Sequence, residues 1–280
     1  AWDQDRISEA VITAENSDVV ILCVGLNETL EGEEGDTGNS DASGDKVDLH
    51  LPKVQEELIE KVTAVGKPTI VVLMAGSAID LNYAQDNCNG ILLAWYPGAR
   101  GGRAIADLLF GKESPSGKLP ITFYKDLEGM PEFTDYSMKN RTYRYMEKEA
   151  LYPFGYGLTY SDTCVTEAEV VGEVSAEADI MLKATVKNNG TVDTDEVVQV
   201  YIKDLDSPLA VRNYSLCGFK RVSLKAGEEK TVEFTISNKA MNIVDEDGNR
   251  YIAGKHFRLF AGVSQPDTRS AELTGHKPAE

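Results

Sequence analysis

Three short apolar runs near the start of the chain constrain its fold more than any other feature. They are residues 19–25 (VVILCVG), 69–74 (TIVVLM) and 91–95 (ILLAW), and segments with helical spacing separate them. Strands that are apolar throughout have both faces buried, which is typical of parallel sheets covered by helices. The runs therefore predict an α/β sandwich, in which a mostly parallel open sheet carries helices on both faces.

Helical patterns surround these strands. Apolar residues recur at helical spacing over residues 3–16 and 53–65, and shorter helices are expected at 79–85 and 103–110. Three strands make a small sheet, since a mean sheet has about 5–6. We therefore expect further strands of this sheet to precede the sequence.

The rest of the chain changes character twice. Residues 112–160 are rich in glycine, proline and aromatic residues, with one short strand expected at 121–123, which is typical of an ordered docking or functional segment. After residue 160, segments of alternating polarity are separated by turn residues, which predicts a fibronectin-III or immunoglobulin-like β-sandwich of about seven strands. We predict three parts: an N-terminally incomplete α/β domain (1–125), an ordered interdomain segment (126–160) and the β-sandwich (161–280).

Composition excludes several classes of function. The chain carries 28 Lys and Arg against 46 Asp and Glu, a net charge of −18, so nucleic-acid binding, which needs clustered basic residues, is excluded. Its apolar runs are far shorter than the roughly 20 residues of a membrane-spanning helix, so we expect no membrane partner. The four cysteines form no Cys-x-x-Cys pair, and the sequence has no nucleotide-binding glycine loop. We therefore predict no metal and no cofactor.

Two of the cysteines bear on the compartment. Cys23 and Cys88 lie in or beside predicted core segments, so we expect buried free thiols rather than a disulfide framework. Free thiols favour a reducing, cytoplasmic compartment over secretion.

The stretch LEGEEGD, residues 30–36, follows the first predicted strand. The ends of parallel strands are where open α/β sheets place their ligand sites. Clustered carboxylates at such a place suit acid–base chemistry, because their mutual repulsion favours a protonated form of one of them. Two other interpretations stay open from the residues alone: a solvated acidic surface, and a calcium loop, although the EF-hand spacing is missing.

Several collinear motifs give the chain a resemblance to the C-terminal part of family 3 glycoside hydrolases. They lie in both predicted domains and in the segment between them, and together they span nearly the whole sequence. The stretches that carry the resemblance are VGL (24–26), LEGE (30–33), DLHLP (48–52) with Gln55, WYPG (95–98) with Gly101 and Gly102, LLFG (108–111), PSGKLP (115–120), RTYRY (141–145), YPFGYGLTY (152–160), VQVY (198–201) and LCGFKRV (216–222).

The resemblance implies an active site shared with another domain. It implies a protein with a (β/α)8 barrel, an α/β sandwich and often a fibronectin-III-like domain. The barrel would carry an aspartate nucleophile. In many members of the family a glutamate from an α/β-sandwich loop is the general acid/base. Retaining glycosidases place these two carboxyl groups about 5–5.5 Å apart. We therefore expect the partner to be a barrel domain or chain that carries the nucleophile.

Aligned residue by residue, Glu33 matches the family's acid/base because it stands three residues before Asp36. The sequence departs from the family pattern at Gly35 and Thr37, so Glu31 and then Glu34 stay as alternatives. The predicted substrate-binding residues are Trp95, Tyr96, Arg141 and Arg144. For these four, a core tryptophan that caps the sheet and arginines that anchor a domain interface are the competing interpretations.

The predicted function is that of the C-terminal portion of a retaining β-glycosidase. The resemblance favours a β-glucosidase that removes terminal β-D-glucosyl residues from a β-linked glucoside or oligosaccharide. A β-xylosidase of the same family, and a non-catalytic carbohydrate-binding or scaffold fragment, are the alternatives. Alone, without the barrel, the chain is expected to be inactive, and whether it forms a homo-oligomer stays open.

Overall fold

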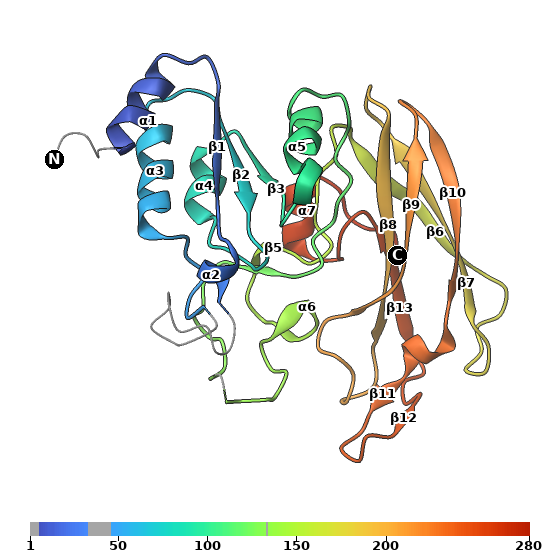
Figure 1. Cartoon of the computed structure of the whole chain (residues 1–280). Helices are drawn as coiled ribbons and strands as arrows, with labels where there is room; N and C mark the ends of the chain where they lie inside the picture. Colours follow the sequence, from blue (N-terminus) through green and yellow to red (C-terminus); the bar gives the residue numbers. More distant parts are fainter. Residues whose placement is uncertain (1–5, 33–45, 133) are drawn as a thin grey trace. The chain divides into compact units, whose positions relative to one another are not determined.

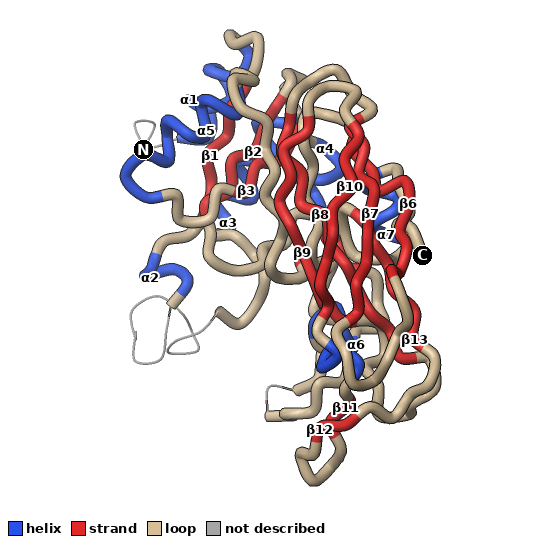
Figure 2. Tube along the Cα trace, turned by 90° about the vertical axis from the view of Figure 1, so that its right-hand side faces the viewer, coloured by secondary structure: helices blue, strands red, loops and turns tan. Residues whose placement is uncertain are grey.

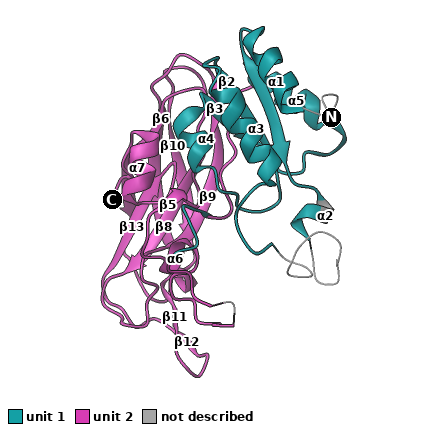
Figure 3. Ribbon diagram, turned by 90° about the vertical axis from the view of Figure 1, so that its left-hand side faces the viewer, with its two compact units in different colours: residues 1–109, 123–128 teal, residues 110–122, 129–280 magenta. Residues whose placement is uncertain are grey.

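The computed structural model describes residues 6–32, 46–132 and 134–280. The chain divides into two compact units (Figure 3): residues 1–109 with 123–128, and residues 110–122 with 129–280. Each unit is a group of residues that contact one another more than they contact the rest of the chain. The predicted domain boundaries at residues 125 and 160 stay a prediction.

The first unit contains a parallel sheet with the strand order β1-β2-β3. Its strands are β1 (Val20–Gly25), β2 (Thr69–Met74) and β3 (Gly90–Leu93). Helices α1 (Arg6–Glu15), α3 (Lys53–Thr63) and α4 (Asn82–Asn87) lie on one face, and α5 (Gly101–Leu109) lies on the other (Figure 1). Short elements α2 (Glu28–Glu31) and β4 (Phe123–Tyr124) complete the unit. The predicted parallel sheet with helices on both faces is confirmed.

Burial follows from the place of each strand in the sheet. The central strand β2 buries Val71, Val72 and Leu73 completely, as its continuous apolar run predicts. The outer strand β1 alternates instead: Leu22 is buried, while Cys23 is exposed. The prediction that Cys23 is a buried thiol is therefore wrong, and the argument for a reducing compartment no longer rests on it.

Helix α4 begins later than its apolar pattern predicts. The expected start was Ile79, and the observed one is Asn82. The carboxylate of Asp80 accepts hydrogen bonds from the backbone N–H of Asn82 at 2.9 Å and from its side-chain amide at 2.7 Å. Such a local bond to the backbone favours a turn before the helix, and Ile79 is buried within that turn.

The second unit is built around a β-sandwich (Figure 2). One sheet has the order β10-β7-β6 and the other β13-β8-β9. Each neighbouring pair within the two sheets is antiparallel. The strands are β6 (Thr163–Val171), β7 (Ile180–Asn188), β8 (Thr194–Asp204), β9 (Ser215–Leu224), β10 (Glu229–Ile236) and β13 (Phe257–Gly262), with a small hairpin of β11 (Ile243–Val244) and β12 (Arg250–Tyr251).

The sandwich core consists of the inward-facing residues of both sheets, among them Leu182, Val200 and Phe234. Helix α7 (Thr268–Thr274) follows the last strand, and Asp267 caps it by accepting from the backbone N–H of Ser270. Beyond α7, the backbone N–H and C=O of Ala279 bond to those of Ala261 in β13, each at 2.9 Å.

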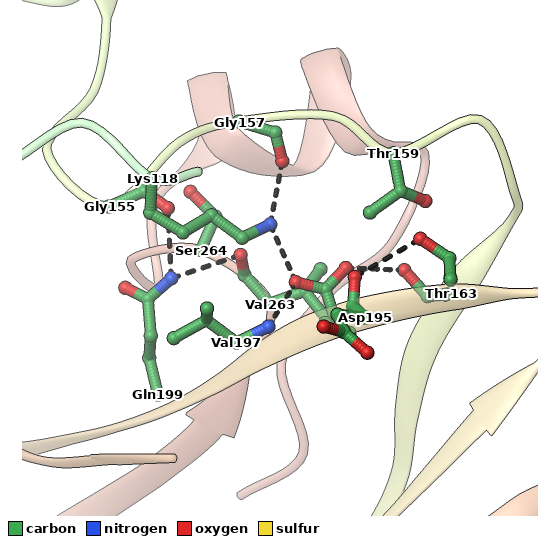
Figure 4. A network of polar contacts seen from close by, with 12 residues as sticks. Lys118, Gly155, Gly157, Thr159, Thr163, Asp195, Val197, Gln199, Val263 and Ser264 are labelled. Carbon is green, nitrogen blue, oxygen red and sulfur yellow. Dashed lines mark hydrogen bonds and ion pairs between the residues drawn. The ribbon is translucent and has the colours of Figure 1, made fainter. Parts of the chain in front are cut away.

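A buried ion pair joins the segment before residue 122 to the sandwich of the same unit (Figure 4). Lys118 Nζ lies 2.8 Å from Glu196 Oε1 and donates to the carbonyl of Gly157 at 2.6 Å. The hydroxyl of Thr163 donates to Glu196 Oε2 at 2.5 Å, and the N–H of Val197 donates to Oε1 at 2.6 Å. The side chain of Glu196 is 1% exposed, so its charge is compensated entirely inside the protein.

The buried side-chain amide of Gln199 lies in a neighbouring set of hydrogen bonds. Gln199 Nε2 donates to the carbonyls of Gly155 at 2.9 Å and Val263 at 3.1 Å, and its Oε1 accepts from the Tyr201 hydroxyl at 2.6 Å. Lys118, Gly155 and Gln199 each come from a different motif of the resemblance. These motifs therefore meet in a packing arrangement, where polar groups buried together satisfy one another.

Candidate functional site

The first unit gathers functional side chains at one edge of its sheet. Glu31 follows β1, Gly76 and Ser77 follow β2, and Tyr96 follows β3. The three strands are parallel and adjacent, so the segments after their carboxyl ends meet at the same edge. We call Glu31, Lys46, Gly76, Ser77 and Tyr96 the edge cluster.

The carboxylate of Glu31 is bound by the turn after the central strand. Its Oε1 accepts from the Ser77 hydroxyl at 2.6 Å and from the Gly76 N–H at 3.2 Å. The short helix α2 brings Glu31 to this place, because Asn27 accepts the backbone N–H groups of Leu30 and Glu31 at the helix start. The half-buried Glu31 is thus held on both its backbone and its side chain.

Gly76 leaves no room for a side chain between Glu31 and Tyr96. A Cβ built on Gly76 would lie 2.6 Å from Glu31 Oε2 and 2.8 Å from Cε2 of the Tyr96 ring. Carboxylate and ring therefore approach each other across one backbone position. Tyr96 is 52% exposed, so part of its ring is open to a ligand.

The residue before Tyr96 has a strained backbone. Trp95 has a φ of +50°, a left-handed conformation that costs an L-residue with a Cβ roughly 1–2 kcal/mol. Such strain persists where the surrounding structure enforces it, and it is frequent at functional sites. Here it turns the chain sharply at the end of β3, just where Tyr96 joins the edge cluster.

Lys46 brings positive charge to the edge cluster. Its Nζ donates to the Ser77 hydroxyl at 3.5 Å, so Ser77 contacts both Lys46 and Glu31. Burial lowers the pKa of Lys46, and the nearby carboxylates of Glu31 and Asp48 oppose this effect. A half-buried ammonium next to a carboxylate makes this edge the polar end of an otherwise apolar sheet.

Hydrogen bonds from a side chain of α3 fix the end of strand β1, which precedes Glu31. The side-chain amide of Gln55 accepts from the Gly25 N–H at 2.7 Å and donates to the Gly25 carbonyl at 2.8 Å. A Cβ on Gly25 would lie 1.9 Å from the Met74 carbonyl oxygen, so only glycine fits there. This explains why VGL and Gln55 belong to the same set of motifs.

The structure describes some of the predicted site residues and not others. Glu33 and Glu34 lie outside the described residues. Glu31 and Tyr96 are brought together at the sheet edge, and Trp95 directly precedes Tyr96 with a strained backbone. Their catalytic and substrate-binding roles stay predictions.

The two predicted arginines belong to the second unit. Arg141 Nη2 donates to the carbonyls of Glu132 and Asp135, both at 3.0 Å, and Arg144 Nε donates to the Ser215 hydroxyl at 3.2 Å. These contacts hold the segment around α6 (Thr142–Tyr145) to its own unit. A substrate-binding role for the arginines stays a prediction.

Sequence reasoning missed Lys46, Gly76 and Ser77. The available signal was the Ala75-Gly76-Ser77 stretch directly after the strand 69–74, where a glycine permits close approach and a serine supplies a donor. In the part of the chain that the structure describes, no three His, Cys, Asp or Glu side chains are grouped so as to hold a metal ion. None of the described helices is long and apolar enough to cross a membrane.

Comparisons with known proteins show the family of the chain. The glycosyl hydrolase family 3 C-terminal domain matches residues 3–160, and a fibronectin type III-like domain matches residues 196–265. The chain is 39% identical over 270 residues to a xylan 1,4-beta-xylosidase of Xylanibacter ruminicola, covering 95% of this chain and 31% of that protein. It is 31% identical over 273 residues to a periplasmic beta-glucosidase of Salmonella typhimurium, covering 93% of this chain and 34% of that protein.

Among solved structures, the chain is similar to a GH3 beta-glucosidase of Bifidobacterium adolescentis, with a TM-score of 0.82 and 33% identity over 94% of this chain and 40% of that one. The chain spans about a third of the length of the curated relatives that it matches. Because the family domain matches more than half of its residues, the chain belongs to glycoside hydrolase family 3, in which it corresponds to the C-terminal domain followed by a fibronectin type III-like domain.

Proposed function

We propose that the chain supplies the general acid/base to a retaining β-glycosidase whose nucleophile is an aspartate on a (β/α)8 barrel. The observation that carries this proposal is the exposed Tyr96 ring at the sheet edge where Glu31, the first glutamate of the acidic stretch, is held. An aromatic face beside an acidic stretch suits a sugar, because the sugar ring stacks on aromatic side chains. Membership of the glycoside hydrolase family supports the same reaction class.

The reaction runs in two steps. In the first, Glu33 donates its proton to the glycosidic oxygen while the barrel aspartate attacks the anomeric carbon, so the aglycone leaves as an alcohol and a glycosyl-enzyme ester forms. In the second, the Glu33 carboxylate takes a proton from water, and the resulting hydroxide attacks the anomeric carbon and releases the aspartate. The proton lost in the first step is thus regained in the second.

For the sugar, the sequence favours a β-glucoside, whereas the relatives favour a β-xyloside. Three relatives with 39%, 34% and 34% identity are named xylosidases, and relatives named glucosidases have 31%, 32% and 34% identity. We therefore propose a terminal β-xylosyl residue as the first candidate substrate and a terminal β-D-glucosyl residue as the second. Both are β-linked pyranosides, so the edge cluster serves either.

The test uses the enzyme in which this chain is combined with its barrel. Aryl β-xyloside and aryl β-glucoside, both with a good leaving group, are hydrolysed by the wild type and by Glu33→Gln, with and without azide. Loss of the acid/base slows turnover by about 10²–10⁴-fold. Azide needs no base to attack the glycosyl-enzyme, so we expect it to restore turnover and to yield a glycosyl azide.

The matched control is Glu57→Gln, which removes one exposed carboxylate from helix α3 and should leave turnover unchanged. Unchanged turnover in Glu33→Gln would contradict the assignment of Glu33. An assembled enzyme that binds but does not hydrolyse either glycoside would favour the alternative of a non-catalytic carbohydrate-binding fragment.

A further inference from the structure

We propose that Glu31 is a positioning residue that fixes the base of the acidic stretch, and that it is not the proton donor. This inference rests on the proposed function, because it assigns a second glutamate of the same stretch a different role. It concerns the contacts of Glu31, Lys46, Gly76 and Ser77, all of which the structure describes.

The Glu31 oxygens are occupied by its own domain. A general acid must carry its proton and direct it at the leaving-group oxygen. Oε1 of Glu31 instead accepts from both Ser77 and Gly76, and Oε2 lies 2.6 Å from the place that a Cβ on Gly76 would take. Both oxygens face the turn after β2, so this carboxylate serves as a hydrogen-bond acceptor for its own domain.

Ser77 contacts the two residues that flank the acidic stretch on either side. Its hydroxyl donates to Glu31 at 2.6 Å and accepts from Lys46 at 3.5 Å. Glu31 and Lys46 flank residues 32–45 in the sequence, and they meet at this one hydroxyl. Ser77 follows the central strand β2, whose apolar residues Val71, Val72 and Leu73 are completely buried, so the anchor point is rigid.

Residue 76 is a glycine, so no side chain stands between its backbone and Glu31. A Cβ there would lie 2.6 Å from Glu31 Oε2, which would push the carboxylate off the turn. Glycine at this position therefore permits the contact on which the anchoring depends. Since a misplacement of about 1 Å at a reacting group costs about 10²-fold in rate, such anchoring matters for the neighbouring acid/base.

The experiment compares Glu31→Ala, Ser77→Ala and their double variant with Glu33→Gln, all in the barrel-containing enzyme. Loss of the anchor should lower kcat by about 10-fold, well below the 10²–10⁴-fold of a lost acid/base. Because Glu31 and Ser77 act through one contact, the double variant should lose no more than either single one. Azide should not restore turnover, and the pH profile should keep both limbs. Ser77→Thr, which retains a hydroxyl, should restore most of the rate.

Three results would overturn the inference. Azide rescue of Glu31→Ala would make Glu31 itself the acid/base. Losses that add in the double variant would separate Glu31 from Ser77. Unchanged hydrogen exchange at the Gly76 amide in Glu31→Ala, which removes the acceptor, would show that the bond holds nothing in place, and this readout needs no activity. By contrast, a wild-type enzyme that cleaves no glycoside while the Gly76 amide exchanges faster in Glu31→Ala would overturn the proposed function and leave the anchor itself supported.

Discussion

Glu31 in the first unit and Glu196 in the second have similar local chemistry and opposite surroundings. Each carboxylate accepts one hydroxyl hydrogen bond and one backbone N–H. Glu196 is also paired directly with Lys118 at 2.8 Å, and its side chain is 1% exposed. Glu31 is half-buried and lies beside an exposed aromatic ring.

A structural carboxylate and a carboxylate beside a ligand site differ in their surroundings. A buried charge with a full set of partners has no route to a ligand, and it contributes to the fold or to its specificity. A carboxylate at the carboxyl edge of a parallel sheet is next to solvent and to residues from several strands. The number of hydrogen bonds does not distinguish the two glutamates, whereas burial and position do.

The largest expected effect is on stability, at Glu196. Glu196→Gln leaves the buried Lys118 ammonium without its counter-charge, and breaking a buried ion pair costs about 3–5 kcal/mol. Glu31→Gln should cost less than about 1 kcal/mol, because its partners can reach water. Urea unfolding of the chain followed by tyrosine fluorescence measures both.

The control for Glu196 is the double variant Lys118→Met/Glu196→Gln. It removes the uncompensated charge, so it should be more stable than Glu196→Gln alone. A double variant as unstable as the single one would mean that the hydrogen bonds from Thr163 and Val197, and not the ion pair, hold this site together.

The next effect separates two glycines, Gly155 and Gly76. Gly155 has a φ of +78°, and a Cβ there would lie 2.3 Å from Gln199 Oε1 and 2.6 Å from the Tyr201 hydroxyl. Gly155→Ala should therefore lower the free energy of unfolding by more than about 2 kcal/mol, from backbone strain and overpacking together. Thermal unfolding is the measurement.

Gly76→Ala is the matched variant in the edge cluster. Its Cβ would meet the far end of Glu31 and the exposed Tyr96 ring, which can move aside. The expected stability loss is under about 1 kcal/mol, while kcat/KM of the barrel-containing enzyme falls. A Gly76→Ala enzyme with normal kcat/KM would contradict a functional role of the edge cluster.

The smallest effect concerns an exposed pair near the start of α3. His50 Nδ1 lies 2.8 Å from Glu56 Oε1. This hydrogen bond raises the pKa of His50 above its ordinary 6.5, with a smaller contribution from the Asp48 and Asp80 carboxylates. The pair therefore stabilises the fold below pH 6.5, and this stability is lost as the pH rises through the raised pKa.

The side chains of His50 and Glu56 are 56% and 37% exposed, so the contribution should be below about 0.5 kcal/mol. Unfolding midpoints measured on either side of neutrality, in wild type and His50→Gln, check it. An equal pH dependence in both proteins would assign the effect to other groups.

The sequence predicts a helix or strand well where the burial of its residues is the same along its whole length. Strand β2 is found at its predicted bounds because its residues are buried on both faces. The alternating pattern of the sequence does not predict strand β6, since its second half is largely exposed and carries Glu167 and Glu169 on its polar positions. Tertiary packing, and not local pattern, forms that strand.

For the site, the acidic stretch and Tyr96 could be predicted because strand ends and residue types are visible in the sequence. The anchoring contacts could not. Ser77 meets Glu31 and Lys46 from a different strand, and the order of strands in the sheet decides which turns come together. Similarly, nothing local marks Lys118 as the partner of Glu196.

The pairing of Ala279 with Ala261 has a practical consequence. β13 is the outer strand of its sheet, and the last residues of the sequence cover part of its free edge. Exposed strand edges attract strands of other molecules and promote aggregation. Changes to residues 277–280 would uncover this part of the edge, so these residues should be kept intact when the sandwich is produced.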